Sequence, residues 1–250
     1  MLTFDGVSHG FGRLAVLRQI SLEVTRGSFV ALVGPSGCGK TTLLNLAAGL
    51  AQPDEGAVHY NGARLTKPNT SAGYLTQDDA LLPWRDVLDN VALPLEIKRV
   101  DKPSRHASAR DIIAKVGLAG FEHHRPAELS GGMRKRVSLA RTLIYRPETL
   151  LLDEPFGALD AQTRVLMQKQ LLDLTGEFKL TVLLVTHDIG EALALSEKIA
   201  LMSARPGRIA EVLEVRHPEN RDVFRPHGNA ELHAHIWDHL AAQAGEMRGT

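Results

Sequence analysis

The sequence predicts an α/β protein with a central, mostly parallel β-sheet covered by helices. Short apolar runs that indicate buried strands occur at residues 28–33, 72–77, 149–153, 181–187 and 198–203. Helical segments at 41–50 and 161–175 lie between strands of this set. Because strands that alternate with helices are typical of parallel sheets with both faces covered, we assign the core to that class.

The N-terminal part predicts a small antiparallel β subdomain. Residues 2–8 and 20–25 show the polar–apolar alternation of half-buried strands. Residues 56–65 read as a hairpin with its turn at Asn61-Gly62.

A helical subdomain interrupts the core at about residues 86–146. The pattern there is mostly helical, with breaks expected at Pro94, Pro103 and Pro126. We expect a single domain over residues 1–216 and a short polar tail over 217–250.

Composition excludes several classes of function. The 29 basic residues balance the 29 acidic ones, so no net field attracts nucleic acid, and no nucleic-acid partner is expected. The single cysteine, Cys38, excludes internal disulfides and a cysteine zinc cluster, and suits a reducing compartment. The first residues resemble no secretory signal, and no apolar run approaches the ~18 residues of a membrane span. We therefore expect a soluble, cytoplasmic chain.

The stretch "GPSGCGKT" (34–41) predicts a nucleotide site, because a strand precedes it and a helix follows it. The candidate binding residues are Gly34, Pro35, Ser36, Gly37, Cys38, Gly39, Lys40, Thr41 and the following Thr42. The glycines let backbone N–H groups face phosphate oxygens. Lys40 is expected to reach the β- and γ-phosphates and Thr41 to ligate Mg²⁺. The alternative, a glycine-rich turn that binds nothing, suits these flanks less well.

Two further strand ends offer catalytic groups. The strand in "TLLLDEP" ends in Asp153, a candidate Mg²⁺ ligand, and Glu154 follows as the group that orients or deprotonates the attacking water. The alternative is an acidic pair that caps the next helix. His187 ends the strand "TVLLVTH", and we expect it at the same sheet edge in contact with the γ-phosphate, although a lone histidine is often only a satisfied polar group.

The stretch "AELSGGMRKRV" predicts a helix that begins at an anion. Ser130 is a good N-cap, and Gly131 and Gly132 bare the backbone N–H groups beside it. The first turn nevertheless holds three cations, Arg134 to Arg136, where the helix dipole is already positive. We interpret at least two of the three as a solvated basic face.

Together these segments make the chain resemble the ATP-binding subunit of an ABC transporter over nearly its whole length. The segments that carry the resemblance are Walker A (34–42), the Q-loop at Gln77, the signature "LSGGM" with Ser130, Gly131, Gly132 and Met133, Walker B at 150–154, the D-loop "GALD" with Asp160, and the H-loop at His187. The resemblance implies a RecA-like P-loop NTPase core and an ATPase coupled to transport. It also implies that Phe11 stacks on adenine and that Gln77 helps to hold Mg²⁺.

The resemblance implies partners as well. Two copies would pair head to tail, with each signature closing over ATP held by the other copy's Walker A. We expect separate permease subunits, a periplasmic or surface substrate-binding protein, and a position at the cytoplasmic face of the membrane. Residues 81–97 and 204–209 resemble importers of nitrate, sulfonates and taurine.

Two residues depart from the family pattern. Met133 replaces the usual glutamine of the signature, and Gly157 replaces the commoner serine of the D-loop. Because methionine donates no hydrogen bond, we expect altered ATP affinity rather than loss of hydrolysis.

Three alternatives compete with this interpretation. The ATPase of a lipid or lipoprotein exporter shares these motifs. A non-transport ABC ATPase is disfavoured by the short insert and the single cassette, and a P-loop kinase or GTPase has no use for the "LSGG" helix.

Finally, Leu81, Leu82, Pro83 and Trp84 form an apolar run directly after the Q-loop. We interpret Leu81, Leu82 and Trp84 as part of a groove for a permease helix, with inward packing of Trp84 as the alternative.

Cys38 either fits the loop as a small residue or gains thiolate character at the helix N-terminus. For His233 and His235 in the tail, an exposed helix face is preferred to a metal site.

Overall fold

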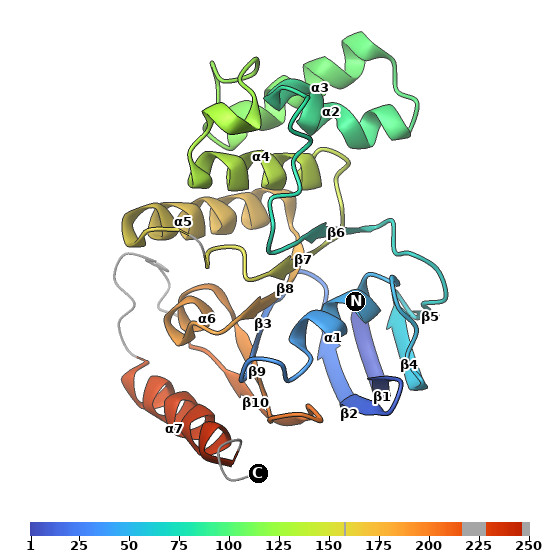
Figure 1. The fold of residues 1–250 in the computed structure, drawn as a ribbon, viewed down its shortest axis with the longest axis vertical. Coiled ribbons are helices and arrows are strands. Elements are labelled where there is room, and N and C mark those ends of the chain that lie inside the picture. Colours follow the sequence, from blue (N-terminus) through green and yellow to red (C-terminus); the bar gives the residue numbers. More distant parts are fainter. Residues whose placement is uncertain (158, 217–228, 247–250) are drawn as a thin grey trace.

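A six-stranded sheet forms the centre of the computed structural model, which describes residues 1–157, 159–216 and 229–246. Its strand order is β10-β9-β3-β8-β7-β6. The strands are β3 (Phe29–Val33), β6 (Ala72–Leu75), β7 (Thr149–Asp153), β8 (Thr181–Thr186), β9 (Lys198–Met202) and β10 (Ile209–Glu214). Every adjacent pair is parallel except β10 with β9, which confirms the predicted parallel core (Figure 1).

The strands of this sheet are buried on both faces. In β7, Leu150 and Leu152 pack on one side with the helical subdomain, whereas Leu151 packs on the other side with the N-terminal sheet. The side chains of β3 and β8 alternate in the same way. Double burial explains why these strands read as continuous apolar runs.

The N-terminal subdomain is the predicted antiparallel sheet, with strand order β2-β1-β4-β5. Its strands are β1 (Leu2–Phe11), β2 (Leu14–Val24), β4 (Glu55–Tyr60) and β5 (Ala63–Arg64). The predicted hairpin turn is confirmed, because Asn61 and Gly62 both have positive φ, 49° and 82°. Helix α1 (Lys40–Ala47) packs between the two sheets and holds the nucleotide loop against the core (Figure 1).

The helical subdomain contains α2 (Val87–Ile97), α3 (Lys102–Lys115), a 3₁₀ turn (Pro126–Glu128) and α4 (Gly131–Leu143). The break expected at Pro94 is wrong, because α2 continues through it to Ile97. A proline inside a helix forfeits one backbone hydrogen bond. The buried face of α2, which includes Val87, Leu88 and Val91, offsets that loss by packing into the core.

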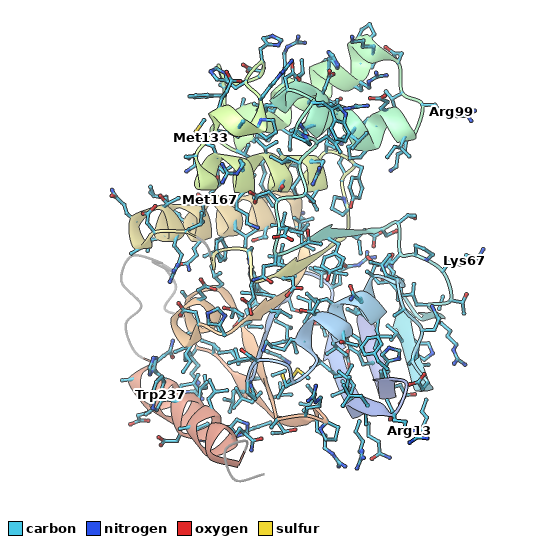
Figure 2. The ribbon with its side chains drawn as sticks, in the orientation of Figure 1. Arg13, Lys67, Arg99, Met133, Met167 and Trp237 are labelled. Atoms are coloured by element: carbon cyan, nitrogen blue, oxygen red, sulfur yellow. The ribbon has the colours of Figure 1, made fainter. Side chains whose placement is uncertain are left out.

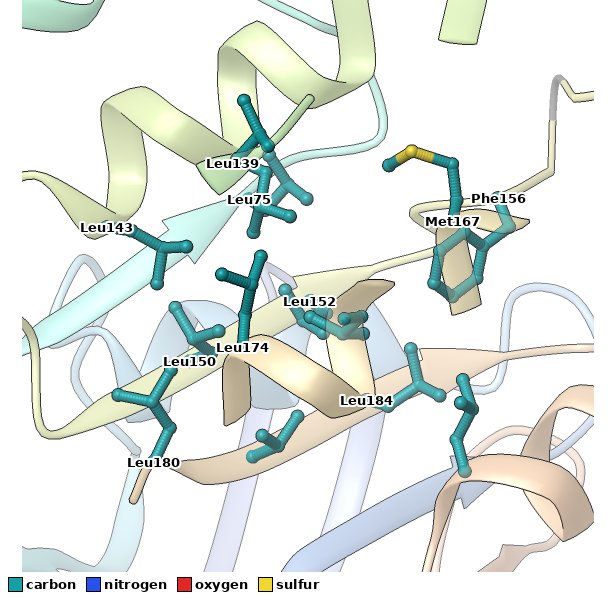
Figure 3. Packing of buried hydrophobic residues seen from close by; sticks show 14 of the residues in the cluster. Leu75, Leu139, Leu143, Leu150, Leu152, Phe156, Met167, Leu174, Leu180 and Leu184 are labelled. Atoms are coloured by element: carbon teal, nitrogen blue, oxygen red, sulfur yellow. The ribbon is translucent and has the colours of Figure 1, made fainter. Parts of the chain in front are cut away.

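Two more helices cover the sheet on the side of α4: α5 (Ala161–Phe178) and α6 (Ile189–Leu195). Figure 3 shows leucines of β7 and β8 meeting Leu139 and Leu143 of α4 and Leu174 of α5. This shared apolar core joins α4 to β7 and β8.

The tail contributes a helix to the fold. Helix α7 (Ala230–Glu246) packs against α6, with Ile236 fully buried, while Trp237 points to solvent (Figure 2). The Gln243 side chain accepts a hydrogen bond from the backbone N–H of Ala204 at 2.7 Å. His233 and His235 are exposed, as expected, and no cluster of metal ligands occurs within the described ranges. The first part of the tail, residues 217–228, lies outside those ranges.

None of the helices in the described part of the chain is long and apolar enough to cross a membrane.

Candidate functional site

The phosphate loop connects the end of β3 to the start of α1. Gly39 has φ 106°, and a Cβ there would lie 2.6 Å from the Leu17 side chain, so only glycine fits. Lys40 is buried and donates to the backbone carbonyls of Gly34 at 2.7 Å and Pro35 at 2.9 Å. Its ammonium is thus held inside the curve of the loop, whose Ser36 and Gly37 are exposed.

Walker A and Walker B meet at one hydrogen bond. The Thr41 hydroxyl donates to Asp153 Oδ1 at 3.2 Å. Burial raises the pKa of Asp153 above its usual value, and the Thr41 bond and the charges of Lys40 and Lys135 oppose that rise. A hydroxyl and a buried carboxylate are hard oxygen donors of the kind that Mg²⁺ prefers, so these two residues fit the ion.

Glu154 and His187 are brought together, as predicted from their strand ends. Glu154 Oε2 lies 3.2 Å from His187 Nδ1. Glu154 has φ 44°, a left-handed conformation that is rare for a non-glycine residue, and its N–H donates to Val185 O at 2.9 Å. The backbone of β8 therefore holds the Glu154 carboxylate beside the carboxyl edge of the sheet.

The signature begins α4 as the sequence predicts. Ser130 caps the helix, its Oγ accepting from Met133 N at 3.3 Å. At Gly132 a Cβ would lie 2.6 Å from the Thr163 methyl group, so glycine permits the close approach of α5. Met133 is half-buried against the core. Asp160 caps α5 in turn, and this bond to Thr163 N, 2.9 Å long, lowers the pKa of Asp160.

The solvated basic face expected at Arg134 to Arg136 is wrong. Lys135 is buried and lies 3.3 Å from Asp79, which also pairs with Arg134 at 3.2 Å. Arg136 contacts the sulfur of Met167 on α5. Asp79 supplies the negative charge that these cations need at a helix start, and it comes from the segment directly after the Q-loop.

Gln77 is exposed in the loop that follows β6. In the run after it, Leu81 and Leu82 are half-buried, but Trp84 is 70% exposed, so the alternative of inward packing does not hold.

The loop is fixed by Asn90, which is fully buried in α2. Its side chain accepts a hydrogen bond from Leu82 N at 2.8 Å and donates to the carbonyls of Leu82, Arg85 and Asp86. No local sequence pattern predicts this role of Asn90, which fixes the loop that carries the exposed Trp84.

The thiolate character considered for Cys38 is wrong. Burial raises the pKa of this thiol, outweighing the nearby charge of Lys40. A Cβ at Gly207 would lie 2.1 Å from Cys38 O, so the backbone at Gly207 packs directly against the phosphate loop. The sequence marked residues 204–209, which include Gly207, only by resemblance.

Phe11, at the end of β1, is 61% exposed and meets His9 edge-on at 5.1 Å between ring centroids. It offers a free ring face.

In the D-loop, Gly157 lies beside Glu154, and a Cβ added at Gly157 would lie 3.8 Å from Glu154 Oε2. Ala158 lies outside the described residues.

Comparison with known proteins identifies the family. The family model described as ABC transporter matches residues 17–157, which include both Walker motifs and the signature. The chain belongs to the ABC transporter family. This ABC ATPase binds ATP and hydrolyses it in support of transport, as the sequence predicts.

The relatives of this ABC ATPase include named importer subunits. A taurine import ATP-binding protein, TauB, of Burkholderia thailandensis is 49% identical over 79% of this chain and 76% of its own length. TauB of Pseudomonas aeruginosa is 46% identical over 86% of this chain and 83% of its own length. An uncharacterized ABC transporter ATP-binding protein of Methanocaldococcus jannaschii is 47% identical over 84% of this chain and 79% of its own length.

The fold of this ABC ATPase also matches solved cassettes. The ATP-binding cassette MJ0796, solved as a dimer bound to ADP and Pi after hydrolysis, superposes with a TM-score of 0.76 at 30% identity. The match covers 87% of this chain and 100% of that one.

Proposed function

We propose that this ABC ATPase energises the import of a small sulfonate such as taurine, working as an ATP-bridged homodimer under separate permease subunits. The proposed substrate rests on one observation. Over most of its length the chain is 44–49% identical to proteins named as taurine import ATP-binding proteins. The exporter alternative is not favoured, because the named relatives are import proteins. A periplasmic substrate-binding protein and a position at the cytoplasmic membrane face belong to the same proposal.

The split of the site supports the dimer. Thr41, Asp153, Glu154 and His187 gather at one edge of the sheet, around the phosphate loop. Met133, in the first turn of α4, lies in the helical subdomain, away from α1 (Figures 1 and 2). We infer that these two halves bind one ATP only across the dimer, where a second copy supplies the signature.

In each composite site the residues divide the work. The backbone N–H groups of residues 34–42 and the Lys40 ammonium bind the phosphates, and Phe11 stacks on adenine. Thr41, Asp153 and Gln77 hold Mg²⁺, which when bound neutralises phosphate charge. Glu154 accepts a proton from the attacking water, and His187 holds the Glu154 carboxylate and contacts the γ-phosphate.

The second copy completes the charge stabilisation. Ser130 and the N–H groups of Gly131 and Gly132, at the positive end of α4, face the γ-phosphate. Met133 stands where a glutamine would donate a further hydrogen bond, so its side chain adds none, and its own N–H donates to the Ser130 hydroxyl. Asp160 lies on the D-loop between the two sites and positions α5.

The coupling surface is the loop over residues 81–85. Trp84 is exposed, Leu81 and Leu82 are half-buried, and the buried Asn90 fixes the loop. An apolar patch next to Gln77 suits a short permease helix, so that closure over ATP moves the permease.

Uptake assays test this function. Cells that express the chain together with the permease encoded by the neighbouring genes should accumulate radiolabelled taurine. The Glu154→Gln variant should abolish this accumulation. If a different anion, such as nitrate, is taken up and taurine is not, the substrate class is wrong. If neither anion moves inward, the proposed import of small anions is contradicted.

A further inference from the structure

The loop that carries Gln77 is fastened to the signature helix by side chains along one face of α4. Lys135 Nζ lies 3.3 Å from Asp79 Oδ1 and donates to the backbone carbonyls of Gln77 and of Thr76, the latter at 3.4 Å. Arg134 Nε donates to Asp79 Oδ2 at 3.2 Å. The first turn of α4 thus holds the loop by ion pairs to Asp79 and by hydrogen bonds to backbone carbonyls.

Two further residues of α4 continue the attachment. The Ser138 hydroxyl donates to the Asp79 carbonyl. Arg141 donates to the carbonyls of Ala80 at 2.8 Å and Asp79 at 3.0 Å. Residues 134, 135, 138 and 141 recur at helical spacing, so they form one continuous face against the loop.

The position of Lys135 makes it the centre of this attachment. Lys135 is only 4% exposed, which is unusual for a lysine, and a buried ammonium is costly unless it is paired. Asp79 is the carboxylate that pairs with it, and the two carbonyls flank Gln77 itself. The same helix turn begins at Ser130 and Gly132, which face the other copy's ATP in the proposed dimer.

We propose that Lys135 and Asp79 are positioning residues that make the Q-loop and the signature helix move as one body. When Gln77 shifts toward the phosphates of its own chain, the ion pair carries the start of α4 with it. ATP bound in one copy thereby sets the signature that this copy presents to its partner. The inference rests on the proposed homodimer.

The test uses the purified full chain with Glu154→Gln as the parent, because this parent should form persistent ATP-bridged dimers. Lys135→Met and Asp79→Asn are added singly and together. Lys169→Met is the matched control, since Lys169 is an exposed lysine on α5 paired with Asp173 at 4.0 Å. Two quantities are measured for each protein: the ADP affinity by calorimetry, and the ATP concentration at half-maximal dimerisation by sedimentation.

We expect ADP affinity within about twofold of the parent in all variants, because the phosphate loop is untouched. The ATP concentration for dimerisation should rise about tenfold or more in each single variant and stay unchanged in Lys169→Met. The double variant should be no worse than the worse single variant, since both remove one shared interaction. Circular dichroism checks folding, and if Lys135→Met does not fold, the nearly isosteric Asp79→Asn decides.

The proposal is overturned if the single variants dimerise like the parent, if their effects add, or if ADP affinity falls in parallel with dimerisation. A parent that does not dimerise on ATP would instead contradict the proposed homodimer, so the two failures are distinguishable.

Discussion

His187 Nδ1 lies 3.2 Å from Glu154 Oε2, so the ends of two adjacent parallel strands bring an imidazole and a carboxylate into contact. Glu154 is fixed a second time by its left-handed backbone and by its N–H bond to Val185 O. Both constraints aim the carboxylate at the edge of the sheet where the phosphate loop lies.

Replacing Glu154 by glutamine should keep ATP binding and lower turnover by about two or more orders of magnitude. The amide keeps the shape and the hydrogen bonds but cannot accept the proton of water. Steady-state phosphate release and nucleotide binding on the same preparation check this. Turnover at the wild-type rate would show that another group acts as the base.

Replacing His187 by alanine should lower turnover by about tenfold to a hundredfold and leave the affinity for ADP nearly unchanged. The loss arises because Glu154 is no longer held on its side-chain end. Thermal unfolding should shift little, since the His187 side chain is 61% exposed. A large loss of ADP affinity would place His187 in nucleotide binding rather than in hydrolysis.

Replacing Trp84 by alanine should leave ATPase activity of the isolated subunit nearly unchanged and reduce both permease co-purification and uptake. The side chain is exposed, so its removal costs the fold little. Trp237→Ala is the matched control, because Trp237 is 61% exposed on α7, far from the helical subdomain (Figure 2). Equal loss of co-purification in both variants would remove Trp84 from the permease contact.

The Cys38 thiol should react slowly in the folded protein. Burial raises its pKa above the ordinary value of a thiol, so at pH 8 less of it is thiolate than in the unfolded chain. Alkylation by iodoacetamide, followed by mass spectrometry, should be at least about tenfold slower in buffer than in urea. Equal rates would mean that the loop opens readily or that the thiol is activated.

Local patterns predicted much of this molecule. The glycine positions of the phosphate loop, the Ser130 cap and the strand ends at Asp153 and His187 depend on neighbours in sequence, and the structure places them as expected. The strands of the central sheet could be predicted from their continuous apolar runs, because both faces of the sheet are covered.

What could not be predicted depends on contacts between distant segments. The cations of the first α4 turn look solvated until Asp79, 55 or more residues earlier, is folded against them. Asn90 reads as an ordinary helix residue, although it fixes the loop at Leu82. The raised pKa of Cys38 likewise follows from the packing around it rather than from its place at a helix N-terminus.

Mixing two inactive variants tests the shared site most directly. Lys40→Ala removes the phosphate contact of one half, and Ser130→Arg blocks the signature of the other half, where the exposed Ser130 leaves room for the larger side chain. Each homodimer should hydrolyse almost no ATP, whereas an equal mixture should regain up to about a quarter of the wild-type rate, since half of the randomly formed dimers have one intact site of two. If either variant alone hydrolyses ATP normally, or if the mixture stays as inactive as its parts, the head-to-tail account is contradicted.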